Sequence, residues 1–465
     1  MSIILDATPA VKPELDPGFI PAIIWNRKYR EAVAANGEGL NIVIALNRSA
    51  TIISTYATEI FPHTAEYREL NIKYVERMIK NLLWVKGGYK VTIAGCAELA
   101  ADIKAIYSPE GARAFDYEFM GEKIYGQPFE VIACPLEDAP QSHEIAVKLG
   151  GNMDGCRIGF DLGGSDRKCA AVVDGKVVHS EEIEWDPYFE KDPAYHKAGI
   201  MDSLKRAAAK MPRVDAIGGS AAGVYVNNQP RIASLFRGVD QSDWAEHVTP
   251  IFTNVQQEYN VPMIIANDGD VTALAGAISM ECNGVLGIAM GTSQAVGYVN
   301  LDGNITDWLS ELAFSPVDYR DDAPADEWSG DIGCGVQYFS QQAIARLAPV
   351  AGIELPAGMP FPKQLIEVQQ LMAAGDERAA KIYRTIGVCF GYSIAHYAES
   401  YDVRNLLILG RVTSGKGGDL ILSIAKQLLA DVFPELAATI TFRVPDEKFK
   451  RHGQAVIAAS LPAIK

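Results

Sequence analysis

The sequence predicts an α/β protein of two lobes with a cleft between them, preceded by an α/β N-terminal extension. Three observations lead to this prediction. At 465 residues the chain is too long for one ordinary core, so we expect two or three domains. Strand-like and helix-like segments alternate from about residue 156 onward, as in α/β domains with mixed sheets. A strand–glycine turn–strand unit occurs twice, which indicates two halves that face a shared ligand.

The first of these units begins at IGFDLGGSDRK, residues 158–168. An apolar run follows at 169–173, and Asp174-Gly175 predicts a two-residue hairpin into 176–179, so we expect an antiparallel meander. The periodicity then predicts a helix at 199–211, a strand and glycine loop at 214–223, a helix at 244–259 and a buried strand with acids at its end at 263–270.

The second unit is GVLGIAMGTSQAVGYVNLDGNITDW, residues 284–308. It predicts an apolar strand, a turn at 291–293, a strand at 295–300, a turn at Asp302-Gly303 and a further strand. Helices are expected at 337–347, 376–401 and about 418–429, with a strand at 405–409. We therefore assign 151–270 to the first lobe and 271–449 to the second, and expect a C-terminal helix at 450–465 to complete the first.

Residues 1–150 form a folded extension rather than a tail. A hairpin is expected at 41–55, an amphipathic helix at 65–84 that ends at Gly87-Gly88, and strands at 89–95 and 129–134. The extension lacks the acid-plus-glycine turn of the two units. A structural or assembly role is therefore favoured over a second ligand site.

Composition excludes several classes of partner. The formal net charge is −16 and there is no Lys/Arg run, which argues against nucleic acid. The first residues, MSIILDATPAVKPELDPGF, carry acids and prolines where a signal peptide needs a basic and then an apolar stretch, and no apolar run reaches membrane-spanning length. We expect a cytoplasmic protein with no membrane partner.

Cysteine and histidine spacing predicts neither a disulfide framework nor a metal site built by the protein. The seven cysteines are scattered and never form CxxC, and the seven histidines never form HxxxH or HxH.

The glycine turns point to a phosphate ligand. Gly163 and Gly164 permit φ values that other residues avoid, and successive N–H groups in such a turn can hold an anion, with the Ser165 hydroxyl as a further donor. Asp161 beside this turn would repel a bare phosphate, which indicates a Mg²⁺ ion between them, bound through water. A plain structural hairpin is the alternative for one turn alone. The matching turn Gly291-Thr292-Ser293 favours a phosphate clamp with one half on each side.

A candidate general base follows the strand MIIA. Asn267 and Asp268 lie at its carboxyl end, where side chains of open α/β sheets point into the ligand crevice. Asp268 can accept the proton of a hydroxyl that attacks phosphorus. The alternative is a cap for a helix that begins near Thr272, and both roles can hold at once.

Five segments together resemble the ROK family of bacterial sugar kinases. They are DLGGSDRK at 161–168, GGSAAGVYV at 218–226, NDGDVTALAG at 267–276, MGTSQAVGYV at 290–299 and LLILGRVTSG at 406–415. They occur in that family's order, and the resemblance runs from about residue 156 to the end. It implies two actin-like (ribonuclease H-like) ATPase lobes and an enzyme that transfers the γ-phosphoryl group of ATP, with Mg²⁺, to a hydroxyl of a small sugar. We also expect a homo-oligomer, a dimer.

The resemblance implies a role for each matching residue. Asp268 would be the base and Asp161 would face the magnesium–phosphate group. The other implied contacts are Gly163, Gly164, Ser165, Gly291, Thr292 and Ser293 to phosphate, Gly410 and Arg411 to the nucleotide, and Ser220, Ala221, Gly223, Asn267, Asp268 and Glu311 to the sugar.

Departures from the family pattern concern the sugar pocket. The family's zinc motif CxCGxxGCxE is reduced to SGDIGCGVQYFS, in which Cys334 remains and Val336 stands where the acid belongs, and the family's zinc-ligating histidine appears as Phe314. Zinc is therefore not expected. Because pockets built around substrate hydroxyls discriminate through those hydrogen bonds, hexose specificity is left open. A non-catalytic sugar- or nucleotide-responsive protein on the same fold is the rival hypothesis.

The loop WDPYFEKDPAYH, residues 185–196, is either a lid, a dimer edge or a solvated loop, and the last is favoured.

Overall fold

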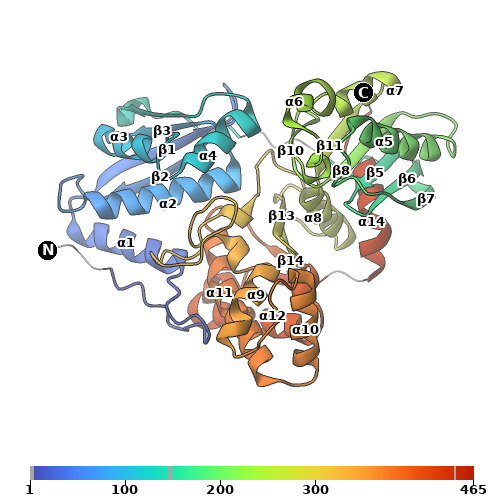
Figure 1. Ribbon diagram of the computed structural model, residues 1–465. Coiled ribbons are helices and arrows are strands. Elements are labelled where there is room, and N and C mark those ends of the chain that lie inside the picture. Colours follow the sequence, from blue (N-terminus) through green and yellow to red (C-terminus); the bar gives the residue numbers. More distant parts are fainter. Residues whose placement is uncertain (1–4, 145–148, 445–446, 465) are drawn as a thin grey trace.

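The computed structural model describes residues 5–144, 149–444 and 447–464, with side chains for all of these except 447–452. Figure 1 shows three parts: an N-terminal domain in blue and cyan, a first lobe in green, and a second lobe in yellow and orange, with the C-terminal helix (red) against the first lobe. None of the helices in the described segments combines the length and the apolar character needed to cross a lipid bilayer.

The N-terminal domain is a mixed four-stranded sheet covered by helices. Its strand order is β2-β1-β3-β4, and β1 is antiparallel to β2 and β3 while β3 and β4 are parallel. The strands are β1 (Leu40–Asn47), β2 (Ile53–Ile60), β3 (Lys90–Ala94) and β4 (Glu130–Cys134), and the helices include α1 (Ala22–Asn36), α2 (Arg68–Lys86), α3 (Ala97–Ile106), α4 (Ala114–Glu118) and the π-helix η1 (Phe119–Tyr125). The expected hairpin, helix and strands are present within a few residues, whereas α1 and α3 were not anticipated.

The first lobe carries a five-stranded sheet of order β11-β8-β5-β6-β7. β5, β6 and β7 form the expected antiparallel meander, and β8 and β11 lie parallel to β5. Its elements are β5 (Cys156–Leu162), β6 (Asp166–Val173), β7 (Lys176–Glu184), α5 (Pro193–Ala208), β8 (Ala216–Ala221), the hairpin β9 (Val224–Val226) and β10 (Gln229–Ile232), α7 (Ile251–Tyr259) and β11 (Met263–Asn267). The expected helix at 244–259 is interrupted, because Pro250 separates α7 from a π-helical turn at Trp244–Val248.

Two glycines bring the C-terminal helix α14 (Glu447–Ala459) onto this sheet. A Cβ on Gly159 of β5 would lie 1.7 Å from the carbonyl oxygen of Ala455, and one on Gly218 of β8 would lie 1.6 Å from that of Ala458. Only residues without a side chain allow the helix backbone to approach this closely. The helix thus packs directly on β5 and β8.

The second lobe has a four-stranded sheet of order β13-β12-β14-β15, in which β14 is parallel to β12. Its elements are β12 (Val285–Met290), β13 (Gln294–Val299), α9 (Gln341–Val350), α10 (Phe361–Ala373), α11 (Glu377–Tyr397), β14 (Asn405–Leu409), α12 (Gly415–Val432) and β15 (Thr441–Arg443). The prediction of a strand after Asp302-Gly303 is wrong, because Ile305 makes an isolated bridge to Val299 rather than part of a strand. The second unit is therefore a hairpin rather than a meander. Helix α8 (Asp268–Ser279) packs on β12 and β13 and also contacts α14.

The N-terminal domain shares a hydrophobic core with the second lobe. Phe19, Ile23 and Val85 belong to the cluster that includes the buried face of α11. On the other side, η1 contacts the β9–β10 hairpin of the first lobe, where Val224 and Ile232 pack against the N-terminal core. The extension therefore touches both lobes.

Candidate active site

Asp161 lies at the end of β5 with one carboxylate oxygen already engaged. Its neighbour on β8, Ser220, donates a hydrogen bond to Oδ1 at 2.7 Å, and the Lys168 ammonium lies 3.7 Å from Oδ2. Burial raises the pKa of this carboxyl. Oδ2 thus already faces a cation, but the carboxylate can still hold Mg²⁺ through water, since proteins bind this ion through one or two carboxylates, several waters and substrate phosphates.

The two residues at the junction of β11 and α8 have different tasks. Asn267 caps α8: its Oδ1 accepts from the Gly269 N–H at 2.7 Å, while its Nδ2 donates to the Gly223 carbonyl at 2.8 Å. The helix therefore begins at Asp268, four residues earlier than expected. The Asp268 carboxylate accepts from the Gly269 N–H at 3.0 Å. Burial first, and then the negative charge of Asp161, raises the pKa of Asp268 to about 6.

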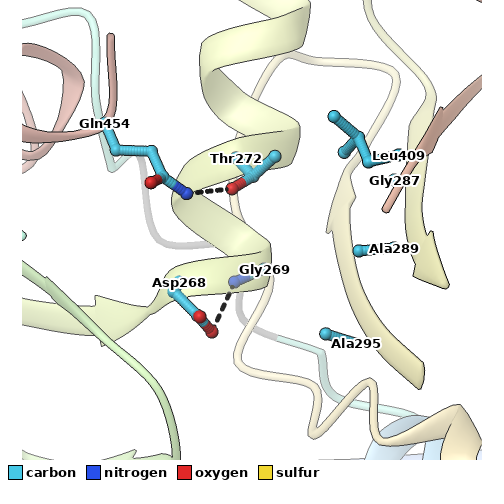
Figure 2. A pocket seen from close by; sticks show the side chains of 8 residues that line it. All are labelled: Asp268, Gly269, Thr272, Gly287, Ala289, Ala295, Leu409 and Gln454. Atoms are coloured by element: carbon cyan, nitrogen blue, oxygen red, sulfur yellow. Dashed lines mark hydrogen bonds between the residues drawn. The ribbon is translucent and has the colours of Figure 1, made fainter. Parts of the chain in front are cut away.

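Two cavities meet this turn from opposite sides. Asp268 and Gly269 line a cavity of about 240 Å³ whose other walls come from α8, the second-lobe sheet and α14, namely Thr272, Gly287, Ala289, Ala295, Leu409 and Gln454 (Figure 2). Asn267 and Asp270 instead line a cavity of about 500 Å³ that faces the N-terminal domain. Asp268 therefore stands at the boundary between two spaces.

Two further carboxyl groups lie close to Asp268. Burial raises the pKa of Asp270 to about 7, and its Oδ1 accepts from the Tyr298 N–H at 3.2 Å. Burial, with the charges of Asp268 and Asp270, raises the pKa of Glu311 to about 8. Neutral carboxylic acids donate and accept hydrogen bonds, which suits a ligand rich in hydroxyls. Sequence reasoning noted acids at this strand end but gave Asp270 no role.

The N-terminal domain holds Glu311 in place. The Glu311 N–H donates to the Trp84 carbonyl at 2.8 Å, and the Ser310 N–H donates to the Val85 carbonyl at 2.9 Å. Ser310 has a φ of 52°, a left-handed conformation that is uncommon for residues other than glycine. The last turn of α2 thus fixes the bend that carries Glu311.

The first glycine turn is tight and partly covered. Within the turn, the Gly163 N–H donates to the Asp166 carbonyl. The Gly163 carbonyl accepts from the Trp185 indole at 2.8 Å. Neither Gly163 nor Gly164 has a positive φ, so the expected reason for these glycines is wrong. Instead, a Cβ on Gly164 would lie 2.2 Å from the Tyr188 ring. Loop 185–192 therefore packs on the turn, and the Ser165 hydroxyl donates to Asp166.

The second glycine turn and the expected nucleotide residues lie around β12 and β14. Thr292 and Ser293 are exposed, and the Gly291 carbonyl accepts from the Gln341 N–H. Gly410 has a φ of 98° and passes so close to Met290 that a Cβ would lie 2.3 Å from the Met290 carbonyl oxygen. The neighbouring Arg411 side chain is exposed. Neither turn lines the two cavities, so the proposed phosphate and nucleotide contacts stay predictions.

The expected sugar contacts differ in their position. Asp268 lines the smaller cavity, and Glu311 lines neither of the two cavities. Gly223 and Asn267 line the larger cavity. Ser220 is fully buried with its hydroxyl on Asp161, and Ala221 is fully buried in the first-lobe core. In this conformation Ser220 and Ala221 therefore lie behind the walls of the two cavities.

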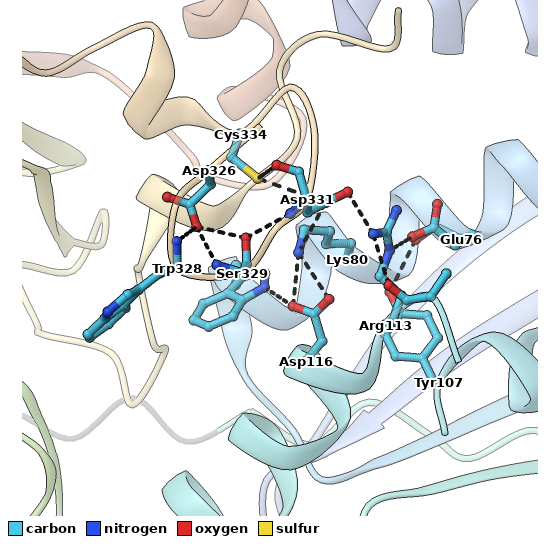
Figure 3. Close-up of polar contacts among 12 residues, drawn as sticks. Glu76, Lys80, Tyr107, Arg113, Asp116, Asp326, Trp328, Ser329, Asp331 and Cys334 are labelled. Carbon is cyan, nitrogen blue, oxygen red and sulfur yellow. Dashed lines mark hydrogen bonds and ion pairs between the residues drawn. The ribbon is translucent and has the colours of Figure 1, made fainter. Parts of the chain in front are cut away.

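A buried ionic network lies near Phe314. The Phe314 ring packs on Trp84 with centroids 4.3 Å apart. Next to it, the fully buried Lys80 ammonium pairs with Asp116 at 2.9 Å and with Asp331 at 3.2 Å (Figure 3). The buried Cys334 lies in the same loop, which this network fastens to α2. Hydrophobic patterning gave no indication of this network, because charged residues on a helix are normally expected to face water.

Comparison with solved structures reproduces this architecture. A ROK hexokinase from Thermus thermophilus aligns with a TM-score of 0.51 and 17% identity, over 65% of this chain and 96% of that chain. A ROK family transcriptional regulator, a homologue of the E. coli MLC protein, aligns with a TM-score of 0.51 and 17% identity, over 66% of this chain and 79% of that chain. A ROK family glucokinase from Streptomyces griseus, in complex with glucose and AMPPNP, aligns with a TM-score of 0.47 and 19% identity, over 66% of this chain and 98% of that chain.

These similarities show the two-lobed actin-like fold, with the N-terminal α/β region outside it. No curated protein sequence matches the chain. The model of the ROK family matches residues 157–460, more than half of the chain, and the chain therefore belongs to the ROK family.

Proposed function

We propose that the protein is an ATP- and Mg²⁺-dependent carbohydrate kinase in which Asp268 is the general base. The observation that carries this proposal is the position of Asp268 at the boundary of two cavities, with a pKa raised to about 6. A base whose pKa lies near the working pH is largely ionised yet basic enough to take a proton. Family membership supports the assignment, since ROK hexokinases share the fold.

The proposed reaction is a direct phosphoryl transfer. The oxygen of a sugar hydroxyl attacks the γ-phosphorus of ATP, the bond from that phosphorus to the bridging oxygen breaks with its electron pair left on ADP, and the hydroxyl proton passes to the Asp268 carboxylate. Asp161 would hold a Mg²⁺ ion through water, and that ion would supply charge neutralisation at the phosphates. Positioning and charge neutralisation supply most of the rate enhancement in such transfers.

The remaining residues orient the acceptor. Asn267 is fixed by its bonds to Gly223 and Gly269, so its position is set before the ligand arrives. Glu311, neutral at pH 7 because its pKa is about 8, can donate to a sugar oxygen and accept from a sugar hydroxyl. Ser220 positions Asp161 by donating to it.

Substitution of the base tests the proposal. With ATP, Mg²⁺ and a broad sugar panel, Asp268→Asn is expected to lower kcat by about 10²- to 10⁴-fold. Asp302→Asn, in the exposed turn after β13, is the matched control and should retain wild-type kcat. If Asp268→Asn stays within a few-fold of wild type on the best acceptor, the base assignment is wrong.

A second candidate is a protein that binds sugar or nucleotide without transfer. Two observations favour it: the chain shares its fold with a ROK transcriptional regulator, and Phe314 adds no polar contact to the acceptor side. ADP release with any sugar would exclude a pure binding protein. Tight sugar binding without turnover, measured by calorimetry, would favour it.

A further inference from the structure

We propose that the N-terminal domain forms the specificity wall of the acceptor site, and that the acceptor is a glycoside whose apolar aglycone rests against this domain. The proposal rests on the proposed function for the sugar end of the ligand. The wall itself is a property of the larger cavity.

The larger cavity is lined by four parts of the chain. Asn267 and Asp270 contribute polar groups beside the base, the β9–β10 hairpin contributes a second side, and residues 305–309 of the second lobe contribute a third. The N-terminal domain contributes Arg48, Ser49, Ile52, Ile124 and Tyr125. The ROK-like part of the chain therefore leaves this space open on the side that the N-terminal domain covers.

The volume exceeds what one sugar ring needs. The cavity measures about 500 Å³, within the range of about 300–1,000 Å³ typical of sites for drug-sized ligands. A single pyranose is small by that standard. A ligand that fills the cavity extends from the carboxyl groups toward the N-terminal wall.

The chemistry of the wall selects an apolar group. Ile52 and Ile124 present hydrocarbon to the cavity, and the hairpin adds Val224 and Tyr225. The charged residue that the N-terminal domain contributes to the lining is Arg48, which is more than nine-tenths buried. Its Nε donates to Asp307 at 3.0 Å, its Nη1 donates to Ser54 and its Nη2 donates to Glu144. Arg48 thus fastens the second lobe to the domain and offers no unpaired charge to a ligand.

The two ends of the cavity consequently differ in kind. Beside the base the lining holds the Asn267 amide and the Asp270 carboxyl, whereas the N-terminal wall and the β9–β10 hairpin contribute mainly aliphatic and aromatic side chains. The polar Asn228 and Asp307 in this lining are already bonded, Asn228 to main-chain atoms of β11 and Asp307 to Arg48. Apolar groups leave water favourably for such a surface, whereas an additional hydrated sugar would lose hydrogen bonds there. A sugar that carries an aryl or alkyl aglycone matches both ends.

The test compares each free sugar with its α- and β-4-nitrophenyl glycosides on the full-length protein. For the sugar that is turned over best, we expect kcat/KM at least tenfold higher for one glycoside than for the free sugar. Ile52→Trp fills the wall from a half-buried position and should remove this preference for the glycoside over the free sugar.

Ala50→Trp is the matched control, because Ala50 lies in the same β1–β2 loop, is exposed and does not line the cavity. Thermal unfolding midpoints of both variants near wild type establish that the fold is intact. Equal kcat/KM for free sugar and glycosides, or a preference that Ile52→Trp leaves unchanged, overturns the proposal.

Failure of kinase activity is separable from failure of this inference. If no carbohydrate is phosphorylated, the proposed function fails. Binding of the same 4-nitrophenyl glycosides, measured by calorimetry, then tests whether the N-terminal domain forms the wall. If Ile52→Trp weakens glycoside binding at least tenfold and Ala50→Trp does not, the result supports the wall. Absence of binding to the wild-type protein overturns it.

Discussion

The main-chain N–H of Glu311 donates to the carbonyl of Trp84 at 2.8 Å, so a residue of the ROK part takes its position from a helix outside that part. The preceding Ser310 keeps a left-handed φ of 52° while its own N–H bonds Val85. Uncommon backbone conformations persist where surrounding contacts over-determine them. The backbone that carries Glu311 is therefore positioned jointly by the two regions of the chain.

The activity should depend on the ionisation of Asp268. Its carboxylate can take the hydroxyl proton only when ionised, and its pKa is about 6. We expect kcat/KM to rise as the pH increases through about 6 and to level off above pH 7. A pH–rate series from 5 to 8 with ATP and the best sugar measures this, and a profile that stays flat down to pH 5 contradicts it.

Glu311→Gln should relieve a pH-dependent loss of stability. The pKa of Glu311 is raised from 4.5 to about 8, so the folded state keeps a proton that the unfolded chain releases. This difference destabilises the native protein progressively as the pH rises from about 4.5 to about 8. The thermal midpoint of Glu311→Gln relative to wild type should thus increase between pH 5 and pH 8.

Exposed Glu327 provides the control for that measurement. Glu327→Gln should give a midpoint difference that does not change with pH. If Glu311→Gln behaves in the same way, the buried-proton explanation is incorrect.

Lys80→Met should destabilise the junction between α2 and the second lobe. Lys80 is fully buried between Asp116 and Asp331, and its loss leaves two buried carboxylates short of a partner. Breaking a buried pair costs about 3–5 kcal/mol. Urea unfolding should show this loss, while Lys28→Met, which breaks an exposed pair with Glu31, should cost less than about 1 kcal/mol. Equal effects of the two variants would argue against the network.

Ser293→Ala should weaken ATP binding without altering stability. The exposed Ser293 is proposed to donate from its hydroxyl to a phosphate, and hydrogen bonds to charged groups are worth about 1.5–3 kcal/mol. An increase of about tenfold or more in the Kd for ATP is expected by calorimetry, with the KM of the sugar unchanged. Ser242→Ala, at an exposed site in the first lobe, is the control, and identical ATP affinity in both variants would reject the clamp.

Gly218→Ala should separate the C-terminal helix from the first-lobe sheet. The new Cβ would meet the Ala458 carbonyl at 1.6 Å, whereas a Cβ on Gly291 meets nothing nearer than 3.6 Å. Overpacking of this kind costs about 1–3 kcal/mol or more. The thermal midpoint should fall for Gly218→Ala and stay near wild type for Gly291→Ala, and a tolerated Gly218→Ala would contradict the close packing.

Local patterns were sufficient to place Asp161 near the end of one strand and Asp268 directly after another. Both strands are apolar, and a two-residue period with flanking glycines is visible in the sequence. The start of α8 was misplaced because Asn267, at the strand end, already caps the helix. The close approach of Tyr188 to Gly164 was not foreseen, because Tyr188 lies in a loop that periodicity does not describe.

Contacts across long separations in sequence were beyond prediction. Arg48 pairs with Asp307, 259 residues away, and Lys80 pairs with Asp331. Each of these residues alone is an ordinary charged side chain, for which a solvated position is the default expectation. Only the three-dimensional arrangement shows that the extension contributes to the larger cavity.

The unequal attachment of the N-terminal domain has a mechanical consequence. Its core is continuous with that of the second lobe, whereas η1 meets the first lobe through a short hairpin. A rotation of one lobe against the other would therefore carry the extension with the second lobe. The relative displacement would then occur at the contact between η1 and the β9–β10 hairpin, and the packing at that contact would limit the rotation.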